Sequence, residues 1–400
     1  MNRHLIATNT CGAGNTIVYL DHAATSWPKP PEVAHAMVTF MEQIGANPGR
    51  SGHRRSIEAA RIVYAAREAI ATLFHAPDPL RVVFGLNVTE ALNLALHGLL
   101  KPGDHVITSS MEHNSMMRPL RTLAQQGVQL TVVNCSPQGL LTPANIEAAI
   151  RPNTRLIALN HASNVTGTIL PIAEVGMIAR RHNLLLLTDE AQTAGAYPVD
   201  MPAEQIDLLA FTGHKSLFGP MGTGGLIVGD RVPDDQLRPL KQGGTGSHSE
   251  HEAQPQFLPD RYESGTPNAV GLAGLEAAIR WVLARGVSEI RNHETSLCQK
   301  FLAGLQEIPG ITVYGSLNPE FQTATLAFNL ANLQPSEVGL RLDEEFNILC
   351  RVGLHCSPAA HRTIGTFPAG AVRISLGCFN TIAEVAYAVQ AIAQIADSAR

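Results

Sequence analysis

The sequence predicts an α/β fold built around a mostly parallel sheet. Over the first 260 residues, short β-branched or apolar runs alternate with helical patterns, which is typical of strand–helix–strand units. The pattern changes after residue 268, where longer helical stretches are followed by two separate strand patterns. Four hundred residues also exceed what one hydrophobic core usually organises, so we expect two domains.

The first part of the chain supplies the predicted sheet. The strand candidates are residues 17–20, 81–84, 105–108, 130–133, 155–160, 184–189, 208–212 and 225–229. The run LLLLTD at 184–189 is apolar until its end, as in strands buried on both faces. Helical patterns at 89–100 and 142–150 fall between these strands, which favours crossover connections.

The second part of the chain predicts a smaller α+β domain. A polar segment rich in Gly and Pro, 242–268, is typical of a long functional loop. Helices are expected at 269–286 and 287–307, strands at 323–330 and 371–377, and a final helix opened by the capping box Thr381–Glu384. We therefore predict a large domain over 17–265 and a small domain over 266–400, which residues 1–16 join.

Composition excludes several classes of protein. A formal net charge of -5 and scattered arginines argue against a nucleic-acid partner. No apolar run reaches membrane-spanning length, and the first residues lack the apolar core of a signal peptide, so we expect a cytoplasmic protein without a membrane partner.

Metal and dinucleotide sites are not expected. The cysteines, at 11, 135, 298, 350, 356 and 378, form no CxxC pair, which argues against a disulfide framework or a thiol-rich zinc site. HSEHE at 248–252 is flanked by loop residues and is better explained as a solvated loop. CGAGNT at 11–16 has no strand before it and is a poor dinucleotide motif.

Lys215 is the most unusual residue of the sequence. Only five of the 29 Lys and Arg residues are lysine, and this one lies in AFTGHKSLFGPM, an otherwise small or apolar run without a carboxylate. A turn lysine that reaches water would explain it. The alternative is a lysine needed as a reactive amine, whose charge is suppressed by burial.

Other polar residues follow the predicted strands, and the carboxyl ends of parallel strands are where ligands gather. Val88 and Thr89 begin a helix whose free amides can hold a phosphate, although Thr89 is also explained as a helix cap. His113 follows one strand and Asn164 another. Asp189 ends the leucine strand, where a buried carboxylate needs a cationic partner from the protein or a ligand. Pyridoxal phosphate requires such a set: an amine, a carboxylate and a helix N-terminus.

At these residues the sequence resembles a known family. The matching segments, in order, are YLDHAAT (19–25), TEALNLAL, MEHNS, HASNVTGT, TDEAQTAG, FTGHKS, ESGTPN, RVGLHC and RISLGCFNT (373–381). Their order and spacing are similar to class V aminotransferases, which are fold-type I pyridoxal phosphate enzymes, and most closely to SufS-like cysteine desulfurases. The resemblance implies a large domain with a seven-stranded, mostly parallel sheet and a smaller C-terminal domain.

The resemblance also implies roles for single residues. Lys215 would hold pyridoxal 5'-phosphate covalently, Asp189 would pair with its ring nitrogen, and His113 would stack on the ring and assist proton transfer. The other implied cofactor contacts are Gln192, Asn164, Val88, Thr89, Thr212, His214 and, from the neighbouring subunit, Thr266. Arg373 would bind the substrate carboxylate, with Arg351, Asn164 and Ala23 beside it.

Cys356 is expected to be the reactive cysteine. Its neighbours in CRVGLHCSPAAHRTIG favour a loop, and Arg351, His355 and His361 could favour the thiolate. A buried structural cysteine is the alternative, and it is our expectation for Cys350, Cys135 and Cys298.

With these residues, the resemblance implies a homodimeric cysteine desulfurase that converts L-cysteine to L-alanine and keeps the sulfur as a persulfide on Cys356. The persulfide would pass to a thiol or a protein acceptor, as in iron–sulfur cluster assembly. A selenocysteine lyase acting on L-selenocysteine, or another class V lyase or aminotransferase, is the alternative. A non-catalytic scaffold is disfavoured because a scaffold needs no reactive lysine.

Overall fold

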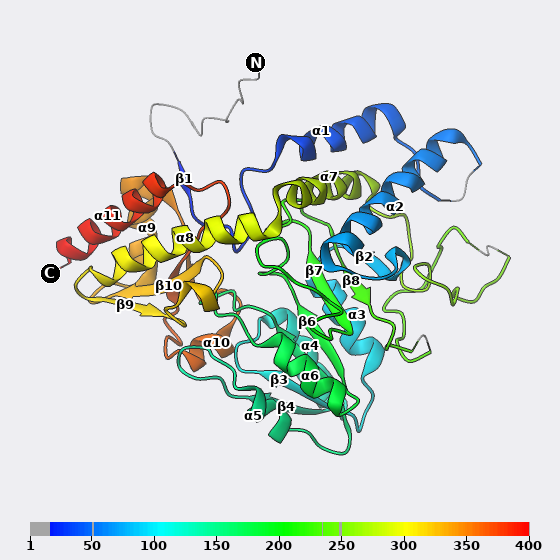
Figure 1. Ribbon diagram of the computed structural model, residues 1–400, viewed down its shortest axis with the longest axis horizontal. Coiled ribbons are helices and arrows are strands. Elements are labelled where there is room, and N and C mark those ends of the chain that lie inside the picture. The colour runs from blue at the N-terminus through cyan, green and yellow to red at the C-terminus, as the bar shows by residue number, and fades with distance from the viewer. Residues whose placement is uncertain (1–16, 50–51, 234, 248–249, 400) are drawn as a thin grey trace.

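The structure is a computed structural model that describes residues 17–49, 52–233, 235–247 and 250–399. Its centre is a seven-stranded sheet (Figure 1). In spatial order the strands are β2 (Val82–Gly85), β8 (Gly224–Val228), β7 (Leu208–Thr212), β6 (Leu185–Asp189), β5 (Thr154–Asn160), β3 (His105–Ser109) and β4 (Gln129–Val133). Among these strands only β8 runs antiparallel to its neighbours, so the predicted mostly parallel α/β sheet is confirmed.

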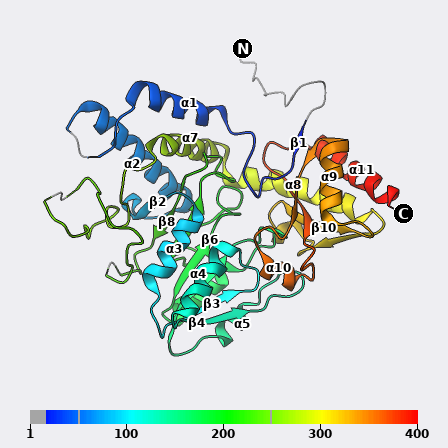
Figure 2. The same cartoon turned by 180° about the vertical axis from the view of Figure 1, so that it is seen from behind.

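Helices cover both faces of this sheet, because its strands are apolar on both sides. Along β7, Leu209 and Phe211 belong to one core cluster, and Leu208 and Ala210 belong to the other. The first cluster includes residues of α1 (Pro31–Thr39), α2 (Arg54–Phe74), α5 (Pro143–Ala148), α6 (Ile172–Arg181) and α7 (Ala269–Arg285). The second includes α3 (Val88–Leu99) and α4 (Asn114–Gln125), which Figure 2 shows from behind.

The C-terminal part forms a second unit, made of one sheet and the helices packed on it, with its own core. Its four-stranded antiparallel sheet has the order β12 (Arg351–Gly353), β13 (Ala371–Ser375), β10 (Thr325–Leu330) and β9 (Ile311–Tyr314). The helices that contribute to its core are α8 (Val287–Gln306), α9 (Pro335–Phe346) and α11 (Ile382–Ser398). The expected capping box is present: Thr381 accepts from the Glu384 amide, and Glu384 accepts from the Thr381 amide.

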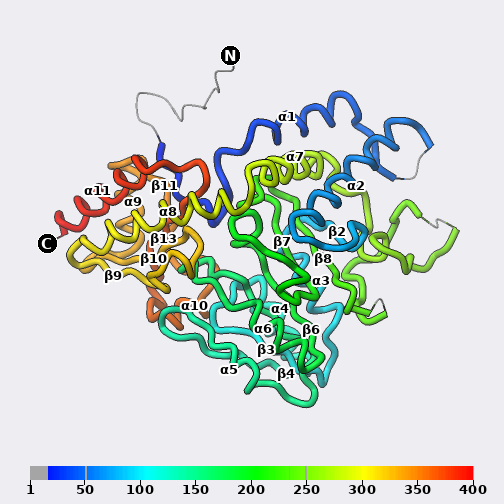
Figure 3. Tube along the Cα trace, in the orientation of Figure 1, coloured from blue at the N-terminus to red at the C-terminus, as the bar shows by residue number. Residues whose placement is uncertain are grey.

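The first described strand lies outside the large sheet. β1 (Val18–Tyr19), which we expected among the strands of the first part, pairs in parallel with β11 (Ile348–Leu349) next to the C-terminal core. Figure 3 shows this N-terminal segment beside β11. Val18 and Leu20 are buried in the C-terminal cluster, so the segment after β1 links the two parts of the molecule.

The division into two domains stays a proposal. α7, which follows our predicted boundary at 265/266, buries Leu272, Leu275 and Ile279 in the core of the large sheet. The first turn of α8 still reaches this core through Ile290, whereas Leu297 and the residues after it pack in the C-terminal core. This packing favours a boundary after Gly286, within the first turns of α8. Residues 1–16, which we expected to join the domains, lie outside the described residues.

One long loop and four short elements connect the rest of the chain. The segment 242–268 contains no helix or strand among its described residues, as the loop prediction requires. The remaining elements are the π-helical turn η1 (Phe40–Ile44), the 3-10 turns η2 (Pro79–Arg81) and η3 (Pro319–Phe321), and the short helix α10 (Pro358–Thr363). Within the described part of the chain, no helix combines the length and apolar character that a membrane span needs.

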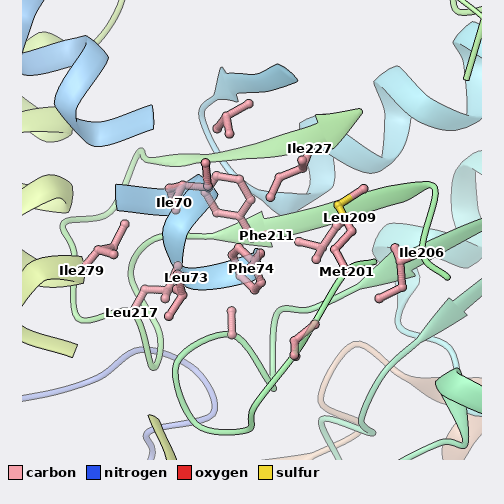
Figure 4. Packing of buried hydrophobic residues seen from close by; sticks show 14 of the residues in the cluster. Ile70, Leu73, Phe74, Met201, Ile206, Leu209, Phe211, Leu217, Ile227 and Ile279 are labelled. Carbon is pink, nitrogen blue, oxygen red and sulfur yellow. The ribbon is translucent and has the colours of Figure 1, made fainter. Parts of the chain in front are cut away.

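The core of the large sheet predicts a stability effect at Phe74. This side chain, 1% exposed, packs against Phe211 of β7 with ring centroids 6.1 Å apart (Figure 4). Phe74→Ala should lower the free energy of unfolding by about 3–5 kcal/mol, measured by urea denaturation, because a buried aromatic leaves a cavity. Phe321→Ala, at a side chain 60% exposed, is the control and should change it little. Equal effects of the two substitutions would contradict this account of the core.

Candidate active site

The candidate site lies at the carboxyl edge of β6 and β7. Asp189 follows Leu187 by two residues and Thr212 follows Ala210 by two, and both apolar residues face the α3 and α4 layer. Because side chains alternate along a strand, Asp189 and Thr212 face the same layer. The sheet thus brings two of the predicted residues to one edge and one face.

Hydrogen bonds to backbone carbonyls hold the loop that carries Lys215. The carbonyl of His214 accepts hydrogen bonds from the Ser26 amide (3.1 Å), the Thr25 hydroxyl (3.0 Å) and the Lys29 amine (2.7 Å). The Lys215 carbonyl accepts from the Ser26 hydroxyl at 2.7 Å. The segment after β1 therefore fixes the loop that carries the lysine.

The Lys215 amine is desolvated but has no direct counterion. Burial lowers its pKa to about 8, with Arg373 and Arg351 adding to the decrease and Asp189 opposing it. No hydrogen bond or ion pair of the described residues involves this amine. A lysine in this condition has a much larger neutral fraction near neutral pH than an ordinary lysine, and the neutral amine is the nucleophilic form.

Asp189 is buried without a protein cation. It accepts a hydrogen bond from the Ala191 amide (2.9 Å) and one from the Ser115 hydroxyl (3.5 Å). Burial raises its pKa to about 6, although the nearby charge of Lys215 opposes this. No ion pair joins Asp189 to any described side chain. The carboxyl group is therefore suited to a cationic group of a ligand.

His113 caps α4 and stays neutral. Its Nδ1 accepts from the Ser115 amide at 3.0 Å and is hydrogen-bonded to the Ser115 hydroxyl at 2.8 Å. Burial, with the charges of Lys215 and Arg373, lowers its pKa to about 4. Sequence reasoning missed its neighbour Glu112, which is fully buried; burial and the charge of Asp189 raise the pKa of this carboxyl to about 8.

Unpaired donors gather at the start of α3. Asn87, rather than Thr89, caps this helix by accepting from the Glu90 amide, so the Val88 and Thr89 amides have no partner within the helix. The turn packs tightly on β8: a Cβ on Gly224, the partner of Thr212 in the sheet, would lie 2.8 Å from the Cα of Asn87.

Two buried polar atoms of the next loop complete this group of donors. Thr212 Oγ1 and His214 Nδ1 have no hydrogen-bond partner among the described residues. Burial lowers the pKa of His214 to about 4, so its ring is neutral. Free amides, a hydroxyl and a neutral imidazole around a helix N-terminus suit an anion such as a phosphate.

Two arginines of the small sheet share one carboxylate. Arg373 Nη2 donates to Asp21 Oδ1 at 2.7 Å, and Arg351 Nε donates to Asp21 Oδ2 at 3.0 Å. Sequence reasoning named both arginines but gave no role to Asp21. The only signal for it was a carboxylate directly after a predicted strand, in YLDHAAT.

Cys356 is exposed on a turn that is anchored to the site, between the buried residues His355 and Ser357. Its carbonyl accepts from the Asn114 amide at 2.9 Å, next to His113. Asn164 holds the flanking residues, since its Nδ2 donates to the His355 carbonyl (2.8 Å) and its Oδ1 accepts from the Ser357 hydroxyl (2.6 Å). Cys356 is the one exposed cysteine among the described residues.

The other cysteines and histidines have more ordinary surroundings. Cys298 and Cys378 are buried, and Cys135 and Cys350 pack against core clusters, as expected for the three of these that the sequence analysis named. Cys11 lies outside the described residues. The expectation that His355 and His361 favour a thiolate as cations is wrong, because burial lowers their pKa values to about 3 and about 4.

The remaining predicted residues divide into two groups. Gln192 Nε2 donates to the Ala23 carbonyl at 3.0 Å, so these two residues meet at the site. Thr266 is exposed and lines a separate cavity of about 660 Å³ with Gly222, Asn268 and Lys241. No described contact joins Thr266 to the residues around Lys215 within this chain.

The fold and the site together define the class. A mostly parallel seven-stranded sheet with a desolvated lysine and a buried carboxyl at its edge, beside a small sheet that carries arginines, is the architecture of fold-type I pyridoxal phosphate enzymes. Residues 18–387 match the aminotransferase class-V family, and the chain belongs to this family.

Individual proteins that are similar to this chain include cysteine desulfurases. A probable cysteine desulfurase from Methanothermobacter thermautotrophicus is 34% identical over 383 residues, which cover 95% of this chain and 94% of that protein. A cysteine desulfurase from Escherichia coli is 34% identical over 93% of this chain and 91% of its own length. The structure of a cysteine desulfurase from Thermococcus onnurineus is similar with a TM-score of 0.90 at 31% identity, over 96% of this chain and 95% of that one.

The desolvation of Lys215 predicts how the reactivity of its amine changes with pH. In protein freed of bound small molecules, the rate of Lys215 acylation by acetic anhydride should reach half its maximum near pH 8, because the neutral amine reacts. A free lysine side chain titrates near 10.4. Peptide mass spectrometry measures the rate. The acylation of Lys300, which is exposed on α8, is measured in the same digest and corrects for decay of the reagent. A Lys215 profile that still rises steeply beyond about pH 10, where an ordinary lysine titrates, would contradict the assignment.

Proposed function

We propose that the protein is a pyridoxal 5'-phosphate-dependent cysteine desulfurase. L-cysteine and the thiol of Cys356 would give L-alanine and a persulfide on Cys356: the carbon–sulfur bond of the substrate breaks, and a sulfur–sulfur bond forms. The position of Cys356 carries the proposal, because its exposed turn is hydrogen-bonded to the residue next to His113 and to Asn164. The family membership and the relatives named above support the same reaction.

The residues present fit the cofactor. The Val88 and Thr89 amides, Thr212 Oγ1 and His214 Nδ1 are free to donate to a phosphate. Asp189, which lacks a protein cation, suits a protonated ring nitrogen. When bound, pyridoxal 5'-phosphate supplies a carbonyl carbon that amines attach to and a ring that withdraws electrons from the substrate.

The protein's own groups would then divide the remaining work. The Lys215 amine would hold the cofactor and, once displaced by the substrate amine, accept the Cα proton in its neutral form, which its lowered pKa of about 8 makes more available near neutral pH than in an ordinary lysine. The neutral imidazole of His113 would stack on the ring, and Gln192 would contact it. Arg373 and Arg351 would bind the substrate carboxylate.

Cys356 would complete the reaction as the sulfur acceptor. A thiolate is a strong nucleophile, and an exposed turn lets it approach the substrate sulfur and afterwards an external acceptor. Burial keeps His355 and His361 neutral, whereas the charges of Arg373 and Arg351 act on His355, the residue before Cys356.

The reaction predicts a specific effect of removing this thiol. Cys356→Ser should lower alanine formation from L-cysteine by about 10²-fold or more, as expected when a reacting nucleophile is removed. Wild-type protein given L-cysteine alone should gain the mass of one sulfur on the Cys356 peptide. Cys350→Ser is the control: burial raises the pKa of Cys350 to about 12, so it stays a thiol, and its loss should leave the rate nearly unchanged.

The opposite outcome would point to another reaction. If Cys356→Ser forms alanine at the wild-type rate and the peptide gains no sulfur, then a different class V lyase or aminotransferase reaction is responsible. Release of alanine from L-selenocysteine but not from L-cysteine by the wild type would favour the selenocysteine lyase alternative.

We also propose that the protein is a homodimer in which Thr266 contacts the partner's phosphate group. The cavity beside Thr266 carries exposed apolar side chains, Tyr64, Leu80 and Leu86, which a partner would cover. A closed two-fold dimer is the commonest oligomer.

The dimer proposal predicts how the cofactor is retained. Light scattering should give the mass of two chains, and Thr266→Ala should weaken cofactor retention by about tenfold, since it removes a hydrogen bond to a charged group. Thr72→Ala, at another exposed threonine, serves as the control. A fully active monomer, or unchanged retention in Thr266→Ala, would defeat the proposal.

A further inference from the structure

Asp21 is an acidic residue in a pocket assigned to an acidic substrate group. Its two oxygens bind different arginines: Oδ1 accepts from Arg373 Nη2 at 2.7 Å, and Oδ2 accepts from Arg351 Nε and forms an ion pair with its Nη2, both at 3.0 Å. Arg373 is 2% exposed, so its charge is almost fully removed from water. Two positive charges and one negative charge therefore meet at this point of the site.

We propose that Asp21 is a specificity-determining residue, which sets the net charge of the Arg351–Arg373 pair to one and so favours amino acids with a single acidic group. The proposal rests on the function proposed above, in which these arginines bind the substrate carboxylate. Asp21 acts through the arginines and is a positioning residue.

The charge balance of the surrounding groups supports this inference. The substrate carboxylate neutralises the single net charge, whereas a second acidic group would leave an excess negative charge in a desolvated site. The nearby imidazoles of His113 and His355 supply no further positive charge, because burial lowers their pKa values to about 4 and about 3. Lys215 faces Asp189, which offsets its charge when both are ionised.

Arg373 also keeps donors for a ligand. Its Nη1 donates to the Asn164 carbonyl at 3.0 Å, and its Nη2 donates to Asp21, but its Nε is buried without a partner among the described residues. Asp21 and the Asn164 carbonyl thus hold the guanidinium in one orientation and leave part of its donor edge for one carboxylate.

The backbone around Asp21 does not depend on its carboxylate. Asp21 forms a parallel bridge with Ser375, the Ala23 amide donates to the Ser375 hydroxyl at 2.8 Å, and the Leu20 amide donates to the Leu349 carbonyl at 2.8 Å. We therefore expect Asp21→Asn to keep the fold of this segment while it removes the charge.

The test compares two amino acids of nearly equal shape. Isothermal titration of the purified enzyme with L-asparagine and L-aspartate should show that the wild type binds L-asparagine at least about tenfold more tightly. Asp21→Asn should shift this ratio toward L-aspartate by about tenfold, and Asp21→Glu should retain the wild-type preference. Arg351→Gln, which removes one positive charge at a half-exposed position, should disfavour L-aspartate further and provides a second test if Asp21→Asn does not fold.

A matched control separates charge selection from loss of a buried ion pair. Asp207 pairs with Arg231 at 3.1 Å, at the other end of β7 from the site, and Asp207→Asn should leave the ratio unchanged. An unchanged ratio in both Asp21→Asn and Arg351→Gln would overturn the inference while the function stands. Failure of the wild type to bind these two ligands and also L-alanine, the proposed product, would overturn the function and the inference together.

Discussion

The close approach of a buried amine and a buried carboxyl group that do not pair with each other is the constraint on which the site depends. Lys215 and Asp189 each interact with the other's charge, yet no ion pair joins them, and burial moves the pKa of each toward neutrality, to about 8 and about 6. A protein that needed only stability would pair these groups or replace them. Because neither group pairs with the other, the two suit a ligand that offers a carbonyl carbon to the amine and a cation to the carboxyl group.

The rest of the structure keeps this arrangement in place. Strands β6 and β7 bring the two residues to one edge, and the segment from Asp21 to Lys29 fixes the Lys215 loop through the His214 carbonyl. The same segment is attached to the C-terminal core through β1 and to both arginines through Asp21. One stretch of chain therefore positions both the arginines proposed to bind the substrate and the lysine proposed to hold the cofactor.

Sequence reasoning predicted the parts of the fold in which apolar runs differ clearly from the segments around them. The seven strands of the large sheet are short runs rich in apolar and β-branched residues, so the pattern located each one. Helix α2 was missed because four of its ten buried residues are alanine and two more are Ser56 and Arg67, which weakens the apolar pattern of its buried face.

For the site, the sequence indicated residue types but not their partners. Lys215 and Asp189 stood out because charged side chains are rarely buried unless they are paired. The pairing of Asp21 with Arg373 spans 352 residues and has no local signal. The neutral state of His355 and His361 follows from burial, which a single sequence does not reveal. The roles assigned to Thr266 and the other contact residues stay predictions.

The central claim is that Lys215 holds the cofactor, and borohydride reduction tests it most directly. The purified protein is reduced, digested and mapped by mass spectrometry for a peptide that carries the pyridoxyl phosphate group. This account predicts the label on Lys215, and its absence in Lys215→Ala under the same treatment. A label on Lys29, Lys101, Lys241 or Lys300, or no label on protein that contains pyridoxal 5'-phosphate, would contradict it.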